Sequence, residues 1–280
     1  MAPSRVYDDI DMVTMYGAFY LILVPLSVFI IVFDELIREK IDHLRQGMEL
    51  LGTQNGAYWA SWVVSATFLN VLVNSEFCLL ATYYYKFSVF VRSPLPVNLL
   101  MMILVTQAYV MMACFFTTVT NSRTTAFSIN FSLVLVSLVI NIIISEPSTL
   151  KKIFYNKDST MVFKTFTWIF HLNPCFHFAK MFQDITNVAC SSLNPKTVGW
   201  EKSTRHFDYS DIFLEQEGAF FTQEKYHVPS LLQTSCETFY ICLMYVLLAW
   251  YFDSILSQNR GVPQPKLFFL SPFYWIPSLQ

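Results

Sequence analysis

Charged residues are scarce in this sequence. Lysine, arginine, aspartate and glutamate supply 14% of its 280 residues, whereas hydrophobic residues supply 54%. Because a typical soluble domain carries roughly a quarter charged residues, the composition excludes an ordinary soluble protein. It indicates an integral membrane protein whose chain crosses the membrane several times.

Motifs for common chemistry are absent as well. The 7 glycines are too dispersed to build a phosphate-binding loop, and neither GxxxxGKS nor GxxxxGKT occurs. The formal net charge of -2 offers no basic surface for nucleic acid, and the 6 cysteines form no CxxC pair. No serine, histidine and carboxylate converge within an apolar stretch, which disfavours a membrane-embedded enzyme. We therefore expect no catalytic residues, no metal and no cofactor in this chain.

Five apolar stretches are long enough to cross a membrane as helices, which requires about 20 mostly apolar residues each. They comprise residues 15–33, 58–83, 97–120, 124–144 and 231–252. Only a short polar segment around Arg123 separates the third stretch from the fourth, so these two should form a tight helical hairpin. The sequence predicts an all-α, polytopic fold with five transmembrane helices in a single membrane domain over residues 1–280.

A further apolar stretch, residues 161–185, is interrupted by Asn173 and Pro174. Pro174 lacks a backbone N–H donor and disfavours helix at the residue before it, so each half is too short to span the membrane. We predict a re-entrant helical hairpin that enters and leaves the membrane on the same side. A polar loop with short helices outside the bilayer should follow at residues 186–230. The alternative is one kinked full span, which would invert the topology of everything after it.

An amphipathic stretch, residues 36–51, lies between the first two predicted spans. Its apolar residues recur at steps of three and four, as on one face of a helix: Ile37, Ile41, Leu44, Met48 and Leu51. The charged side chains on the remaining surface include Arg38, Glu39, Lys40, Asp42, Arg45 and Glu49. We expect one short helix that lies at the membrane surface or against a partner and ends at Gly52.

Polar residues also occur inside the second predicted span. Thr67, Asn70 and Asn74 recur at steps of three and four and therefore share a helical face. Such residues usually hydrogen-bond to neighbouring helices; the alternative is a polar lining for lipid headgroups. Glu76 lies off this face, and an intramembrane acid is a functional candidate because its burial is costly. Glu237, near the start of the last span, is a weaker candidate of the same kind.

Two histidines and a cysteine in the broken hairpin have the side chains of metal ligands. Pro174 interrupts the turn that would join His171, Cys175 and His177, and no fourth ligand is near in sequence. We therefore expect no metal here. If the hairpin is re-entrant, Cys175 and Cys190 both lie on the same side of the membrane, and a disulfide between them could form in an oxidising compartment.

Two groups of residues resemble the A subfamily of ABC transporters. The first group comprises Glu39-Lys40, Leu44-Arg45, Met48, Leu51-Gly52 and the following Tyr58-Trp59-Ala60-Ser61-Trp62. The second comprises Trp250-Tyr251-Phe252-Asp253, Gly261-Val262-Pro263, Phe268-Phe269-Leu270 and Tyr274-Trp275. Between them, the tight hairpin, the broken hairpin and the final span follow the order of that family's membrane half. The family's first span, large extracellular domain and nucleotide-binding domain have no counterpart in this sequence.

The resemblance implies a role for the amphipathic stretch. Residues 36–51 would form the coupling helix that transmits ATPase motion to the spans, with its charged residues facing a partner. The resemblance would place this helix on the cytosolic side. The re-entrant hairpin and the exofacial loop over residues 186–230, with Cys175 and Cys190, would then lie on the non-cytosolic side. The alternative is an interfacial helix that only anchors the chain.

The resemblance also implies partners and a cargo. The partners would be a nucleotide-binding domain and a second transmembrane half, and the cargo a membrane lipid. ATP and Mg²⁺ would bind only to the partner domain, so this chain would not be an enzyme on its own. The alternative function is a non-transporting membrane interaction protein that binds a partner ATPase or half-transporter.

Overall fold

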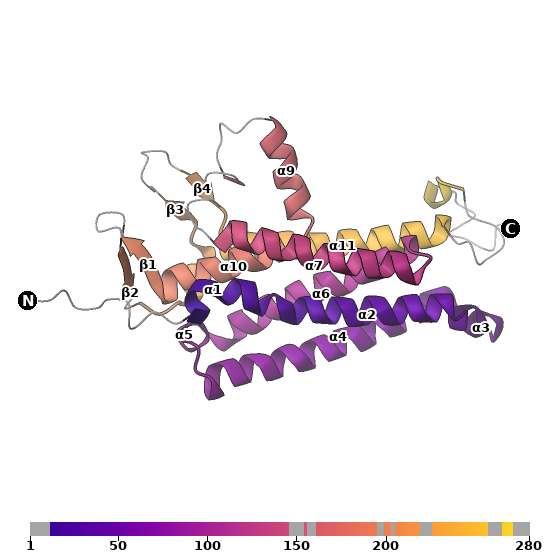
Figure 1. Cartoon of the computed structure of the whole chain (residues 1–280), viewed down its shortest axis with the longest axis horizontal. Coiled ribbons are helices and arrows are strands. Elements are labelled where there is room, and N and C mark those ends of the chain that lie inside the picture. The colour runs from indigo at the N-terminus through magenta and orange to yellow at the C-terminus, as the bar shows by residue number, and fades with distance from the viewer. Residues whose placement is uncertain are drawn as a thin grey trace, which may run out of the picture.

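Long helices that run side by side form the main body of the structure (Figure 1). The computed structural model describes residues 12–145, 154–155, 161–194, 199–202, 205–218, 226–256 and 265–270. Within these ranges, five helical segments are long and apolar enough to cross a membrane: Tyr16–Ile41, Asn55–Tyr84, Leu95–Val119, Arg123–Ile144 and Leu231–Ile255. The predicted class, a polytopic helical protein with five spans, is therefore confirmed.

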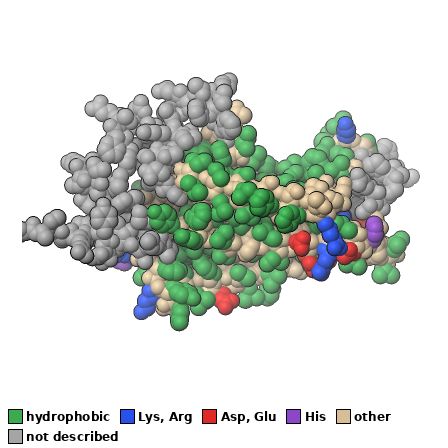
Figure 2. Space-filling model, viewed as in Figure 1, with side chains coloured by type: hydrophobic (Ala, Val, Ile, Leu, Met, Phe, Trp, Pro, Cys, Tyr) green, Lys and Arg blue, Asp and Glu red, His purple; other side chains and the backbone are tan. Residues whose placement is uncertain are grey.

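The centre of the bundle is α6 (Leu95–Val119), against which α2 (Leu23–Ile41), α4 (Asn55–Leu79) and α11 (Leu231–Ile255) pack. The most apolar part of α6 is 61% buried, compared with 22% for α4 and 22% for the fourth spanning helix. The two outer helices therefore expose apolar side chains along their length. Figure 2 shows that such side chains cover much of the middle of the bundle, as expected for a surface that faces lipid.

The first span is longer than predicted. It begins in α1 (Met12–Leu21) and continues through α2 to Ile41, so it includes residues 36–41 of the amphipathic stretch. The chain then turns at Asp42 and His43, and a separate short helix, α3 (Leu44–Leu50), follows. His43 has a φ of 59°, in the left-handed region that ends a right-handed helix. The single helix predicted over residues 36–51 is therefore wrong.

The tight connection between the third and fourth spans is present. α6 ends at Val119, and α7 (Arg123–Ser145) begins after a turn in which the hydroxyls of Ser122 and Thr125 lie 2.7 Å apart. On the opposite side of the membrane bundle, α4 passes into a π-helical turn (Leu80–Tyr84) and a short helix, α5 (Ser88–Val91), before α6 begins.

Two helices separated at Asn173 follow the fourth span, as the sequence predicts. α9 (Met161–His171) stands away from the bundle, whereas α10 (Pro174–Ala189) lies along it. Nearly every residue of α10 is buried, because α6, α7 and α11 surround it. The two helices are shorter than a span; their re-entrant placement in a membrane stays a prediction.

The polar segment after α10 contains strands where short helices were expected. β1 (Ser191–Asn194) pairs antiparallel with β2 (Gly199–Lys202), and β3 (Gln216–Gly218) pairs with β4 (Tyr226–Val228). A 3-10 turn (Tyr209–Phe213) is the one helical element described in this segment, and another (Phe268–Leu270) follows α11. Segments of three or four residues are too short to be stable as isolated helices. Pairing as strands instead provides hydrogen-bond partners for their backbone N–H and C=O groups.

Candidate functional site

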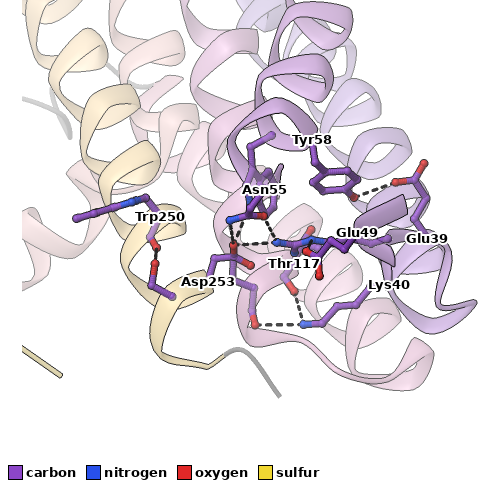
Figure 3. Close-up of polar contacts among 12 residues, drawn as sticks. Glu39, Lys40, Glu49, Asn55, Tyr58, Thr117, Trp250 and Asp253 are labelled. Carbon is purple, nitrogen blue, oxygen red and sulfur yellow. Dashed lines mark hydrogen bonds and ion pairs between the residues drawn. The ribbon is translucent and has the colours of Figure 1, made fainter. Parts of the chain in front are cut away.

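A network of polar side chains joins four helices at the end of the bundle where α3 lies (Figure 3). We call it the foot network and define it as Glu39, Lys40, Arg45, Asn55, Tyr58, Trp59, Trp62 and Asp253. α11 contributes Asp253 in its last turn, and the other members come from α2, α3 and α4. The network therefore connects the first span, the short helix α3, the second span and the last span.

Asp253 is the acceptor at the centre of this network. Its Oδ2 accepts hydrogen bonds from Arg45 Nη2 at 2.9 Å, Asn55 Nδ2 at 3.0 Å and Trp59 Nε1 at 3.0 Å. The Arg45 guanidinium also lies 4.9 Å from the centre of the Tyr58 ring and 5.2 Å from that of Trp59. Cation–π contact and a charged hydrogen bond together fix this side chain, so α3 is tied firmly to the end of α11.

The charged pair at the end of α2 also faces neighbouring helices. Glu39 Oε2 accepts hydrogen bonds from the Tyr58 hydroxyl at 2.8 Å and from Trp62 Nε1 at 2.9 Å, both on α4. Lys40 Nζ donates to carbonyl oxygens at the end of α6, at distances of 2.8, 3.2 and 2.8 Å; they belong to Thr117, Thr118 and Thr120. The last carbonyls of a helix lack partners and carry partial negative charge, so the ammonium caps α6.

The remaining charged residues of the amphipathic stretch stay at the surface. Arg38 pairs with Glu35, and Asp42 accepts a hydrogen bond from Arg123 at 2.9 Å; all four side chains are exposed. Glu49 lies 3.6 Å from the Arg45 Nε. The six predicted coupling residues thus fall into two groups. Glu39, Lys40 and Arg45 make part-buried contacts with neighbouring helices. Arg38 and Asp42 form exposed pairs, and Glu49 pairs with Arg45 within α3.

The tip of α3 exposes two apolar side chains. Leu50 and Leu51 are each 89% exposed, whereas Ile37, at the other end of the predicted apolar stripe, is buried. The largest group of charged side chains visible in Figure 2 lies at this end of the bundle, beside α2 and α3. α3 therefore presents an apolar tip with charged neighbours.

The motif at the far end of the sequence packs onto the same end of the bundle. The ring centres of Trp250 and Phe268 lie 5.2 Å apart, and Phe268 is buried against α11. Residues 261–263, 274 and 275, which complete the motif, lie outside the described residues.

The polar face of the second span packs against α6. Asn70 Nδ2 donates to Gln107 Oε1 at 3.0 Å, and Gln107 Nε2 donates to Thr67 Oγ1 at 2.9 Å. Asn74 Nδ2 lies 3.2 Å from Thr106 Oγ1, and both asparagines are fully buried. These contacts favour helix packing over a headgroup-lined pathway.

Glu76 lies outside that polar face and is exposed on the outer side of α4. The described residues form no ion pair with it; Arg92, a partner considered from its position in the next loop, donates to the carbonyl oxygen of Ala189 instead. Glu76 therefore stays a candidate without an internal partner in the described part of the chain.

The break between α9 and α10 brings together residues that the sequence separates. Glu237 on α11 lies beside His171 and His177, with its Oε2 3.8 Å from the Nδ1 of each. Sequence spacing did not identify Glu237 as a possible third ligand. Glu237 is far from the two histidines in the sequence and comes near them only because α11 packs on α10.

The two cysteines of this region do not form the disulfide considered above. The Cys175 thiol donates a hydrogen bond to the Ser137 carbonyl oxygen on α7, at 3.1 Å. Cys175 and Cys190 are both buried, at opposite ends of α10. A rise of 1.5 Å per residue separates them by about 22 Å, far beyond disulfide range.

Five apolar spans and a charged network that ties them together at one end define a multi-pass integral membrane domain. The model of the ABC-2 family transporter protein matches residues 6–252. The chain belongs to this family.

Curated relatives point to the A family of ABC transporters. The chain is similar to ABC transporter A family member 1 of Dictyostelium discoideum, with 27% identity over 90% of this chain and 27% of that protein. It is also similar to member 11 of Arabidopsis thaliana, with 24% identity over 98% of this chain and 26% of that protein. Member 8 of Dictyostelium discoideum is 25% identical over 90% of this chain and 29% of that protein. The chain spans about a quarter of the length of these relatives.

Proposed function

We propose that this chain moves membrane lipid as the transmembrane component of an A-type ABC transporter. ATP hydrolysis takes place on a nucleotide-binding domain outside these 280 residues, because the sequence has no phosphate-binding loop. Membership of the ABC-2 family and the A-family relatives support a transporter component. The resemblance to the A subfamily supports a lipid cargo and a second transmembrane half as partner.

The contact between Arg45 and Asp253 carries the mechanical part of the proposal. A partner that pushes on α3 displaces Arg45, and this residue binds Asp253 at the end of α11 with a 2.9 Å ion pair. Lys40, just before α3, holds the end of α6 in the same way. A displacement of α3 would therefore reach the central helix and the last span through short, directional contacts.

The nucleotide-binding domain docks on the tip of α3 in this proposal. Leu50 and Leu51 supply exposed apolar area, and Arg38 and Asp42 supply charges of both signs at its edge. An apolar centre with a polar rim is the usual composition of a protein interface. Glu39 and Arg45 do not take part in docking, because α4 and α11 already bind them.

The test is co-purification of the full chain with A-family nucleotide-binding domains. Leu50→Asp with Leu51→Asp should reduce binding at least tenfold, because it places charges at the centre of an apolar contact. Phe213→Asp with Leu214→Asp is the matched control: it alters two adjacent exposed apolar residues in the segment between α10 and α11. Equal binding by both double variants would overturn the docking assignment.

Movement of a fluorescent phospholipid in vesicles separates transport from mere interaction. Vesicles that contain the chain, its second half and the nucleotide-binding domain should move the lipid only with ATP. One observation supports the alternative, a non-transporting interaction protein. The asparagines on the polar face of α4 hydrogen-bond to α6 and so do not line a pathway for lipid headgroups. Docking through α3 without ATP-dependent lipid movement would favour that alternative.

A further inference from the structure

Three metal-ligating side chains converge at the break between α9 and α10. His171 ends α9, His177 lies in the first turn of α10, and Glu237 lies in the second turn of α11. One ligand atom from each of them lies within 4.8 Å of the other two. They come from three helices, so the packing of the hairpin on α11 creates this group.

The hydrogen bonding of His177 fixes which of its nitrogens is free. Nε2 lies 2.9 Å from the His171 carbonyl oxygen, and a carbonyl can only accept, so Nε2 carries the proton in the neutral ring. Nδ1 therefore has a lone pair. It is buried and has no hydrogen-bond partner in the described part of the chain. A ring N–H held by a backbone carbonyl, with the other nitrogen free, is the arrangement that orients metal-bound histidines.

The free nitrogen faces another acceptor. Glu237 Oε2 lies 3.8 Å from His177 Nδ1, too far for a hydrogen bond, and it lies at the same distance from His171 Nδ1. Lone pairs of two acceptors repel each other unless a proton or a cation lies between them. In a tetrahedral zinc site with bonds of 2.0–2.1 Å, the ligand atoms lie about 3.3 Å apart. Small movements of the two partly exposed side chains, His171 and Glu237, would bring the three ligand atoms toward that spacing.

The buried lysine nearby does not fill this role. Lys180 Nζ lies 2.6 Å from Asp184 Oδ2 and also donates to the Pro229 carbonyl oxygen. Its charge is thus balanced by its own carboxylate, one helical turn away. Glu237 remains available to a cation that also contacts the two imidazoles.

We propose that His171, His177 and Glu237 bind one divalent transition-metal ion, with Zn²⁺ the best fit. Two imidazole nitrogens and one carboxylate suit Zn²⁺ and not Mg²⁺ or Ca²⁺, which prefer oxygen ligands. The partial exposure of His171 and Glu237 provides a way in and leaves the fourth position for water. The bound ion joins the break between α9 and α10 to α11. This structural role is independent of the proposed transport function.

The test measures Zn²⁺ binding to the purified, chelator-treated full chain in lipid nanodiscs. One Zn²⁺ should bind per chain, and Co²⁺ in its place should give the absorption of a tetrahedral site. Glu237→Gln and His171→Ala should each weaken binding at least tenfold, since each removes one of three ligands. His206→Ala and Glu76→Gln, which change exposed residues of the same types elsewhere, are the matched controls.

Thermal unfolding provides a second readout that does not depend on activity. Zn²⁺ should raise the unfolding midpoint of the unmodified chain and leave that of Glu237→Gln unchanged, while Mg²⁺ should shift neither. The partly exposed positions of Glu237 and His171 make these two variants better tests than His177, which is fully buried. No Zn²⁺ binding by the unmodified chain, or equal binding by all four variants, would overturn the proposal.

Discussion

Single residues with several partners decide how the end of the bundle is held together. Asp253 accepts three hydrogen bonds on one oxygen, and Lys40 donates three to the end of α6. By contrast, the pairs Glu35–Arg38 and Asp42–Arg123 are exposed, and exposed pairs contribute little. The charges of the amphipathic stretch therefore differ in role although they look alike in sequence.

Asp253→Asn should destabilise the protein by about 2 kcal/mol. The substitution keeps an acceptor for Trp59 and removes the charge that pairs with Arg45; breaking a fully buried pair costs about 3–5 kcal/mol, and here Arg45 keeps Glu49 and two aromatic rings. Glu35→Gln, in the exposed pair, is the control and should cost less than about 0.5 kcal/mol. Equilibrium unfolding in mixed micelles measures both, and equal losses would contradict a structural role for Asp253.

Sequence reasoning at this scale succeeded where the rule is local. Pro174 lacks an N–H and disfavours helix at Asn173, so the sequence itself predicts the break. The side chain of Asn173 caps the new helix by accepting a hydrogen bond from the Cys175 N–H. The partners of Glu237 and Asp253 could not be predicted in this way, because they lie on other helices. Their contacts depend on how those helices pack, which spacing along the chain does not encode.

At the scale of elements, the break in the amphipathic stretch is the main departure from the sequence prediction. Apolar residues keep the helical spacing from Ile37 to Leu51, although the chain turns at His43. Periodicity records which residues are apolar and cannot detect a left-handed residue between two helices. Contacts of Glu39 and Lys40 with α4 and α6 hold the end of α2 in line with the first span.

The effect of a substitution at His43 on stability should depend on whether the new residue tolerates the left-handed backbone conformation. His43→Gly should leave stability unchanged or raise it, because glycine adopts a φ of 59° without strain. His43→Val should lower stability by about 1–2 kcal/mol, since the left-handed region crowds a Cβ, and most of all a branched one. Gln46→Gly, inside α3, is the control and should be destabilising by about 1 kcal/mol. If glycine lowered the unfolding midpoint at both positions alike, the turn at His43 would be in doubt.

At the scale of the whole molecule, the ends of the helices define two opposite faces. Arg45 on α3 contacts Asp253 at the end of α11, and Lys40 contacts the end of α6, so these three helix ends share a face. On the other face, the Phe207 backbone N–H binds the Arg92 carbonyl oxygen shortly before α6 begins. This arrangement fits a hairpin that returns to the side it entered from, because residues 205–218 then lie opposite α3.

Accessibility of two exposed positions to a membrane-impermeant thiol reagent tests this arrangement. Leu50→Cys on α3 and Tyr209→Cys between α10 and α11 are both exposed, and native Cys236, the exposed cysteine of α11, is replaced by serine in both variants. With a re-entrant hairpin, the two cysteines should be labelled from opposite sides of sealed vesicles. A kinked full span would move Tyr209 to the side of α3 and carry Asp253 away from Arg45. Labelling of both cysteines from one side would therefore contradict the re-entrant hairpin and the contact on which the coupling proposal depends.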